Sequence, residues 1–400
     1  MQETIKETTL LHTGKETGAY DAAFAADKAR ISRHFHQSIP GYAPTPLVEL
    51  KAAAQHFGIA ALYVKDESKR FGLNAFKGLG GSFCIASYLA DKLGLNIEEL
   101  TFETLQQPAI HDKIKDLTFV TATDGNHGRG IAWTAHALGV KSLVFMPKGS
   151  APERLHNIQA LGSDASITDM NYDDTVRHAS KVAEEHGWPL VQDTSWPGYE
   201  TIPTWIMQGY LTMALEAAEA LPQAPTHIFL QAGVGAMSGA LTGFFADYYK
   251  GQKPIITIVE PNKADCIYRT ALAHDGKLHN VTGSLSTIMA GLACGEPCGI
   301  GWAELEAHAE HFISMPDYVA AKGMRILGNP LPGDEKVISG ESGAATSGFV
   351  FELLDNASLN ELRDKLGITK DSRILCFSTE GDTDKENYRR IVWDGTHPSF

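Results

Sequence analysis

The chain has 400 residues, of which 43% are hydrophobic and 20% charged, as is usual for a globular protein of two domains. Its formal net charge is −14 and it contains no basic tract, which argues against nucleic acid and anionic membrane surfaces as partners. No apolar run is long enough to span a bilayer, and the first 21 residues lack the apolar core of a signal peptide. We therefore expect a cytoplasmic protein.

Strand-like and helix-like segments alternate through most of the chain, which is typical of parallel sheets covered by helices. The predicted strands are 61–65, 117–121, 142–146, 166–168, 189–192, 227–231, 255–260 and 373–377. The predicted helices are 83–93, 128–138, 152–161, 175–186, 205–220, 238–249 and 342–354. Residues 262–334 show a weaker pattern, for which we expect irregular loops and short helices. Segments 1–40 and 94–116 are expected to add helices and loops.

The five cysteines are scattered and odd in number, so we expect reduced thiols. Cys294 and Cys298 are separated by three residues and have no histidine pair beside them, which is not the spacing of a zinc site. No metal site is predicted. The spacing of Cys266 and Cys294 leaves open whether they form a disulfide.

Lys77 lies at the start of a predicted helix, between Phe76 and Phe83. Desolvation by aromatic neighbours disfavours the charged form of an amine, which makes it a better nucleophile. Such amines form Schiff bases with carbonyls, including the aldehyde of pyridoxal 5′-phosphate (PLP). The alternative is an ordinary surface lysine that follows a turn.

The segment 121–130 leaves a predicted strand and enters a helix, which in parallel α/β folds is the ligand-facing edge of the sheet. Asp124 can act as an acid or base, and Asn126 can donate to a phenolate or carboxylate oxygen. Glycines let the backbone approach a ligand closely, and the helix start attracts anions. Alternatively, Asp124 and Asn126 are helix caps.

A second strand–loop–helix segment contains the small residues Gly233, Val234, Gly235, Ala236 and Met237. Without bulky side chains, successive N–H groups can converge on a phosphate. The pattern also approaches a dinucleotide fingerprint, so a nicotinamide-dependent oxidoreductase stays open as an alternative from another functional class.

Two further polar segments follow predicted strands. Thr379 lies after the last strand, where its hydroxyl could contact a heterocycle nitrogen, and Asp193 lies after strand 189–192, where it could hold a substrate amine. The alternative in both cases is a polar turn.

Taken together and in this order, these segments resemble the fold type II PLP enzymes, the group of tryptophan synthase β and the serine/threonine dehydratases. The resemblance covers about residues 40–390. It implies an α/β fold of two open, twisted, mostly parallel sheets flanked by helices, with PLP between a large and a small domain. The large domain would comprise residues 1–85 and 199–400, and the small domain residues 86–198.

The resemblance also assigns roles to residues. Lys77 would be the Schiff-base lysine, and the other cofactor-binding residues would be Asn126, Gly233, Val234, Gly235, Ala236, Met237 and Thr379. The residues expected to bind substrate are Thr123, Gly125, Asn126, His127 and Asp193. The catalytic residues would be Lys77 and Asp124.

Departures from the dehydratase pattern narrow the family. Asp124 stands where the dehydratases have a neutral residue before Gly125-Asn126. The motif around Thr379, near the C-terminal end, also differs from that of the dehydratases. This combination resembles the diaminopropionate ammonia-lyases, which convert 2,3-diaminopropionate to pyruvate and two ammonia molecules. An extra carboxylate suits a substrate with a second amine. If Lys77 and Asp124 remove protons from opposite faces, both isomers are substrates.

The resemblance implies a homodimer that takes a small amino-acid substrate. A serine/threonine dehydratase or a β-replacement enzyme of the same fold is the alternative within the class. A non-catalytic ligand-binding relative is disfavoured because both Lys77 and Asp124 are present.

Overall fold

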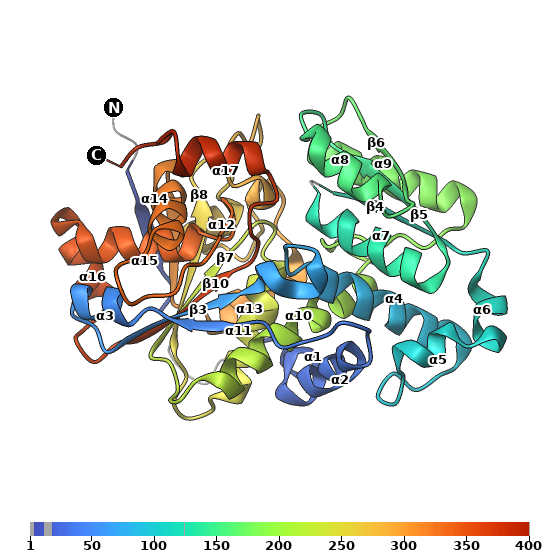
Figure 1. The fold of residues 1–400 in the computed structure, drawn as a ribbon, viewed down its shortest axis with the longest axis horizontal. Helices are drawn as coiled ribbons and strands as arrows, with labels where there is room; N and C mark the ends of the chain where they lie inside the picture. The colour runs from blue at the N-terminus through green and yellow to red at the C-terminus, as the bar shows by residue number, and fades with distance from the viewer. Residues whose placement is uncertain (1–3, 12–17, 124, 400) are drawn as a thin grey trace.

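The computed structural model describes residues 4–11, 18–123 and 125–399 (Figure 1). These residues form two sheets of unequal size in separate lobes, joined by long helices (Figure 1). Asp124, which we predicted to be catalytic, lies outside the described residues. Among the described residues, no helix combines the length and the apolar character needed to cross a membrane.

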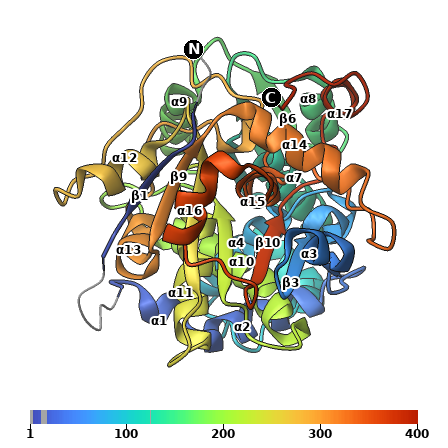
Figure 2. The same cartoon turned by 90° about the vertical axis from the view of Figure 1, so that its left-hand side faces the viewer.

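The larger sheet has seven strands in the order β1-β9-β8-β7-β10-β3-β2. Its strands are β1 (Lys6–Thr9), β2 (Leu47–Glu49), β3 (Ala61–Asp66), β7 (His227–Gln231), β8 (Ile255–Pro261), β9 (His311–Met315) and β10 (Arg373–Ser378). The inner strands pair in parallel, and both edge strands, β1 and β2, pair antiparallel to their neighbours. Figure 2 shows the edge strand β1 beside β9. The inner strands are buried almost throughout because helices cover both faces.

Two helical layers enclose this sheet, and each has its own apolar core. One core includes α2 (Ala26–Gln37), α4 (Gly78–Leu93), α10 (Thr201–Ala220), α11 (Ala236–Tyr248), α12 (Cys266–Ala273) and α13 (Gly299–His308). The other includes α3 (Lys51–Phe57), α14 (Asp317–Gly328), α15 (Ala345–Asp355) and α17 (Lys385–Val392). The short helices α1 (Asp21–Phe24) and α16 (Asn360–Lys365) lie at the margins of these layers (Figure 1).

The smaller sheet has three parallel strands, β4 (Thr118–Ala122), β5 (Lys141–Met146) and β6 (Asp164–Ile167). Its covering helices are α7 (Asn126–Leu138), α8 (Pro152–Gln159) and α9 (Tyr172–His186). The short helices α5 (Phe102–Gln106) and α6 (Pro108–Ile114) lie at the end of this lobe (Figure 1).

Helices α4 and α10 run between the two lobes (Figure 1), and α4 meets α10 and α7 at glycines. A Cβ on Gly209 of α10 would lie 2.5 Å from the carbonyl oxygen of Leu79, and one on Gly130 of α7 would lie 3.0 Å from the Cα of Gly78. These close approaches fix the start of α4, and with it Lys77, against both lobes. The predicted domain boundary at residues 85 and 86 falls inside α4, and the domain limits stay predictions.

Most predicted elements are confirmed within a few residues, and strand 227–231 matches β7 at both ends. The predicted strand 189–192 is wrong: this segment forms only an isolated bridge between Leu190 and Val120. The expectation for 262–334 is wrong in part, because this region contains the buried strand β9 and the twelve-residue helix α14. The edge strands β1 and β2 were missed, since three or four residues carry too little periodicity.

Candidate active site

Lys77 is the residue that precedes α4, and its side chain reaches into a pocket between the two lobes. The side chain is 16% exposed, and Nζ donates to Oδ2 of Asp193 at 2.7 Å. Phe76 and Tyr210 line the same pocket, with their ring centroids 4.8 Å apart. Phe83, predicted to flank the lysine, packs instead against Phe35 on the far side of α4, at 6.3 Å between ring centroids. The amine is thus partly desolvated and already paired with a carboxylate.

Asp193 is buried and makes several polar contacts. Oδ1 of Asp193 accepts from Gln192 Nε2 at 3.3 Å and from the hydroxyl of Tyr172 at 3.4 Å. Oδ2, which also accepts from Lys77, lies 3.8 Å from Nδ1 of His127. Burial alone would raise the pKa of this carboxyl, but the charges of His127 and Lys77 outweigh it and hold the pKa well below its usual range. Asp193 is therefore an ionised carboxylate that can hold an ammonium group.

The loop after β4 is anchored from within. Thr123 Oγ1 accepts from the backbone N–H groups of Gly125 at 2.9 Å and Gly128 at 3.0 Å. His127 Nε2 donates to the carbonyl oxygen of Val191 at 2.8 Å, which turns Nδ1 towards Asp193. Thr123 and His127 are buried, so these two side chains shape the loop instead of lining the pocket.

Among the described residues of this loop, Asn126 is the one that lines the pocket. Its Nδ2 donates to Oε2 of Glu380, and Oε1 of Glu380 accepts from the backbone N–H of Ser342 at 3.1 Å. Glu380 is buried and lies next to Thr379, so Asn126 joins the small lobe to the end of β10. The amide is held in one orientation at the pocket wall.

All five predicted residues of the loop 233–237 line the pocket where α11 begins. Gly235 has φ +90°, a conformation that favours glycine, and a Cβ there would lie 2.8 Å from Ile267. A Cβ on Gly233 would lie 3.2 Å from the carbonyl oxygen of Gly291. The first N–H groups of α11 and its positive dipole end face this loop, which therefore fits a phosphate.

Gln231 and Thr379 meet at the ends of the neighbouring strands β7 and β10. Gln231 Nε2 donates to Thr379 Oγ1, and to the carbonyl oxygens of Ser342 and Phe377, all at 3.0 Å. Because Thr379 accepts this bond, its own hydroxyl proton can point to a ligand. Oε1 of Gln231 is buried, and no hydrogen-bond partner reaches it within the described part of the chain. These polar groups at the pocket wall fit the edge of a heterocyclic cofactor.

Several pocket residues were missed from the sequence. Tyr172 and Tyr210 lie within helices whose pattern indicates only packing, while Gln231 and Glu380 adjoin predicted strand ends and could have been found by that position. The hydroxyl of Tyr210 is buried without a hydrogen-bond partner among the described residues, and burial raises the pKa of this phenol well above its usual value.

Comparison with known proteins agrees with this geometry. A family model described as pyridoxal-phosphate dependent enzyme matches residues 39–377. Diaminopropionate ammonia-lyase of Escherichia coli strain K12 is 52% identical over 383 residues, 95% of each chain. The chain belongs to the diaminopropionate ammonia-lyase family of PLP-dependent enzymes. The enzyme of that name from Salmonella typhimurium is 51% identical over 90% of this chain and 91% of its own.

Solved structures show the same relationship. The crystal structure of holo diaminopropionate ammonia-lyase from E. coli has a TM-score of 0.92 at 49% identity, covering 99% of this chain and 98% of that one. The same enzyme in complex with an aminoacrylate–PLP azomethine reaction intermediate has a TM-score of 0.91 at 48% identity, with the same coverage. A tomato threonine deaminase, at 17% identity and a TM-score of 0.72, shares the fold.

Membership in this family confirms the predicted fold type II architecture and the PLP cofactor, and it makes the chain a PLP-dependent ammonia-lyase. The nicotinamide-dependent alternative is thereby excluded, because the loop 233–237 lies within the matched PLP family model. The structure pairs none of the five cysteines, all of which lie among the described residues, in a disulfide.

Proposed function

We propose that this chain converts 2,3-diaminopropionate and one water molecule to pyruvate and two ammonia molecules. The observation that carries the substrate assignment is the buried carboxylate of Asp193, 2.7 Å from Lys77 Nζ in the pocket. Once Lys77 is engaged elsewhere, this carboxylate is left without the lysine and attracts a second ammonium group. A substrate with an amine on Cβ supplies that group, whereas serine does not.

The pocket residues divide the task of holding PLP. Lys77 would form the covalent bond, the loop 233–237 would bind the phosphate, and Asn126 would donate to the ring oxygen. The Thr379 hydroxyl would donate to the ring nitrogen, which it leaves less basic than a carboxylate would. PLP supplies an electron sink for the substrate's α-carbon, and a less basic ring favours elimination over transamination.

Proton movements fall to the chain's own side chains. Lys77 Nζ removes the α-proton from one face of the substrate, and Asp124 removes it from the opposite face. Asp193 keeps the β-amine protonated, so it departs as ammonia. The enamine that is released takes up water and hydrolyses to pyruvate and the second ammonia.

A pyruvate-release assay with diaminopropionate and with serine tests the substrate assignment. We expect the wild-type kcat/KM to be higher for diaminopropionate. Asp193→Asn should lower kcat/KM for diaminopropionate about 10–100-fold, because the variant loses a charge-assisted hydrogen bond to the second amine. The loss of kcat/KM for serine should be smaller. Faster turnover of serine by the wild type would instead assign the chain to the serine dehydratase alternative.

Asp124→Asn tests whether the α-proton is removed from both faces of the substrate. We expect activity on D-diaminopropionate to fall about 10²–10⁴-fold, the usual contribution of a general base, with the L-isomer less affected. Equal loss on both isomers would show that Asp124 binds substrate without discriminating between faces.

We also propose that the enzyme is a cytoplasmic homodimer with no nucleic-acid or membrane partner, and that residues 86–198 form the small domain. Light scattering on the purified chain tests the dimer, since a monomeric mass would contradict it. The net charge of −14 and the absence of a basic tract support the lack of polyanionic partners.

A further inference from the structure

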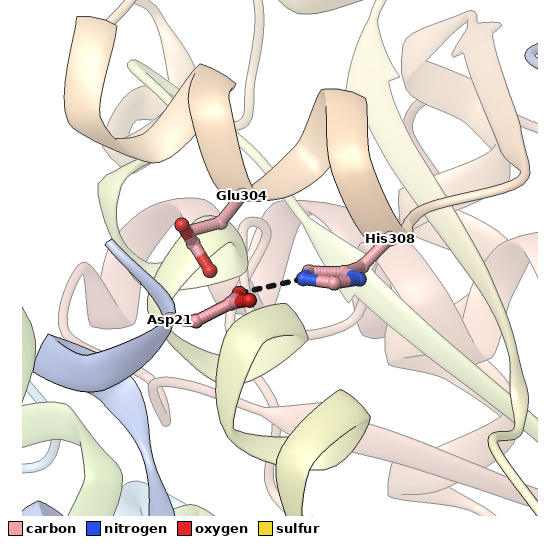
Figure 3. Close-up of side chains that lie close together, drawn as sticks. All are labelled: Asp21, Glu304 and His308. Carbon is pink, nitrogen blue, oxygen red and sulfur yellow. Dashed lines mark hydrogen bonds and ion pairs between the residues drawn. The ribbon is translucent and has the colours of Figure 1, made fainter. Parts of the chain in front are cut away.

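A cluster of three metal-binding side chains lies outside the active-site pocket. Asp21 comes from α1, and Glu304 and His308 come from α13 (Figure 3). One ligand atom of each lies within 4.8 Å of the others. None of the three lines the active-site pocket, and none was singled out from the sequence.

The spacing of Glu304 and His308 explains why two of the three side chains share a face. They are four residues apart on α13, so they lie one turn apart on the same side of the helix. His308 Nε2 lies 2.7 Å from Oδ1 of Asp21, which also accepts from the backbone N–H of Gly18 at 3.0 Å. The imidazole nitrogen and both carboxylates are thus turned to one point (Figure 3).

Glu304 gives independent evidence for a ligand. Its side chain is fully buried, and Oε1 accepts from the backbone N–H of Tyr20 at 2.9 Å. The other oxygen, Oε2, is also buried, and no hydrogen-bond partner reaches it within the described part of the chain.

We propose that Asp21, Glu304 and His308 bind one divalent transition-metal cation of the Zn²⁺ type. One imidazole nitrogen and two carboxylates form a donor set that zinc accepts, with water in the fourth position, whereas Ca²⁺ and Mg²⁺ prefer oxygen ligands alone. The two carboxylates balance the charge of the ion. The Asp21 side chain is 38% exposed, so the site has an entry path and room for a water ligand.

The ion would fasten the N-terminal segment to the large lobe. Asp21 begins α1, and α13 packs against α11, where a Cβ on Gly239 would lie 2.5 Å from the carbonyl oxygen of Gly301. A metal bound to both α1 and α13 therefore crosslinks two helices distant in sequence and stabilises the folded chain.

The test uses untagged, full-length holoenzyme that has been treated with a chelator and then titrated with Zn²⁺ by calorimetry. We expect one Zn²⁺ site, and Asp21→Asn or Glu304→Gln should each weaken its Zn²⁺ affinity at least 100-fold. Loss of a contact that only supports a ligand costs about 10–100-fold, so loss of a ligand itself should cost at least the upper end of this range. Saturating Zn²⁺ should raise the Tm of the wild type by roughly 3 °C and should leave the Tm of Asp21→Asn and of Glu304→Gln unchanged. Both substitutions keep the size of the side chain, and circular dichroism checks that each variant is folded.

Asp275→Asn is the matched control. Asp275 accepts from His279 at 3.0 Å four residues away on an exposed surface, but it belongs to no cluster of three ligands among the described residues. This variant should retain the site. If the wild type binds no more Zn²⁺ than Asp21→Asn and Glu304→Gln do, the proposal is overturned, and Glu304 instead shares a proton with Asp21.

Discussion

Two lysines of this chain form ion pairs of nearly equal length, but only one faces a pocket. Lys65 on β3 donates to Oε2 of Glu216 at 2.6 Å and is 1% exposed. Lys77 donates to Asp193 at 2.7 Å and is 16% exposed, at the wall of the active-site pocket. A short contact between a lysine and a carboxylate therefore does not by itself identify a catalytic amine.

The surroundings of Lys65 are closed and balanced. Arg70 donates to Glu67 at 2.9 Å and to Glu216 at 2.7 Å, so two cations face two carboxylates. Burial raises the pKa of Glu216, but Arg70 and Lys65 outweigh it and lower the pKa to about 2. The backbone carbonyl of Thr45 accepts a further bond from Lys65 at 2.6 Å. This cluster ties β3 to α10 and its side chains are buried, whereas the Lys77 pair lines a pocket.

The largest expected effect separates the two lysines by function. Lys77→Ala should reduce kcat at least about 10³-fold and abolish the visible absorbance of bound PLP, since the variant lacks the amine that bonds to the cofactor. Lys69→Ala, an exposed neighbour, is the control and should keep both. A coloured, active Lys77→Ala protein would contradict the assignment. The measurements are the absorption spectrum and pyruvate release.

The next effect is on stability. Glu216→Gln leaves Lys65 and Arg70 short of one buried negative charge, which should cost about 3–5 kcal/mol in the free energy of unfolding. Glu219→Gln, on the same helix, breaks an exposed pair with Arg33 and should cost less than about 1 kcal/mol. Urea unfolding checks both, and kcat of the folded variants should stay near wild type. Equal urea midpoints for the two variants would show that the cluster around Lys65 is not structural.

A third buried acid sharpens the comparison through pH. Burial, with Glu380 nearby, raises the pKa of Glu341 to about 7, and Asn387 and Arg154 offset this only in part. A raised pKa costs nothing below the unfolded value of 4.5, and the cost grows as pH rises from 4.5 to about 7 and then stays constant. Glu341→Gln should therefore be about 1–3 kcal/mol more stable than wild type at pH 8 and equal to it near pH 4.

Urea unfolding at both pH values measures this difference. Glu386→Gln, an exposed substitution, serves as the control and should show no such dependence on pH. A stability difference that is the same at pH 4 and pH 8 would mean that folding does not shift the pKa of Glu341.

The sequence by itself determined the class of fold and, along the chain, nine of the residues that line the pocket. Buried parallel strands read as short apolar runs, and their carboxyl ends gather at one edge, so Thr379 and the loop 233–237 could be placed near a ligand before any coordinates. Lys77 precedes an apolar helix, and its role followed from the resemblance of the whole set of motifs to the PLP enzymes. The positions of strands and helices are local features, so the periodicity of short segments is enough to predict them.

Only the tertiary structure decided which groups meet. Lys77 and Asp193 are 116 residues apart, and no pattern in either segment predicts their contact. Gln231 and Tyr210 enter the pocket, and Lys65 is closed off from solvent, because of how α4, α10 and the two sheets pack. The contact between Asp21 and His308 also depends on how helices distant in sequence pack together. Contacts between distant segments depend on the summed packing of the whole chain, which the composition of any one segment does not contain.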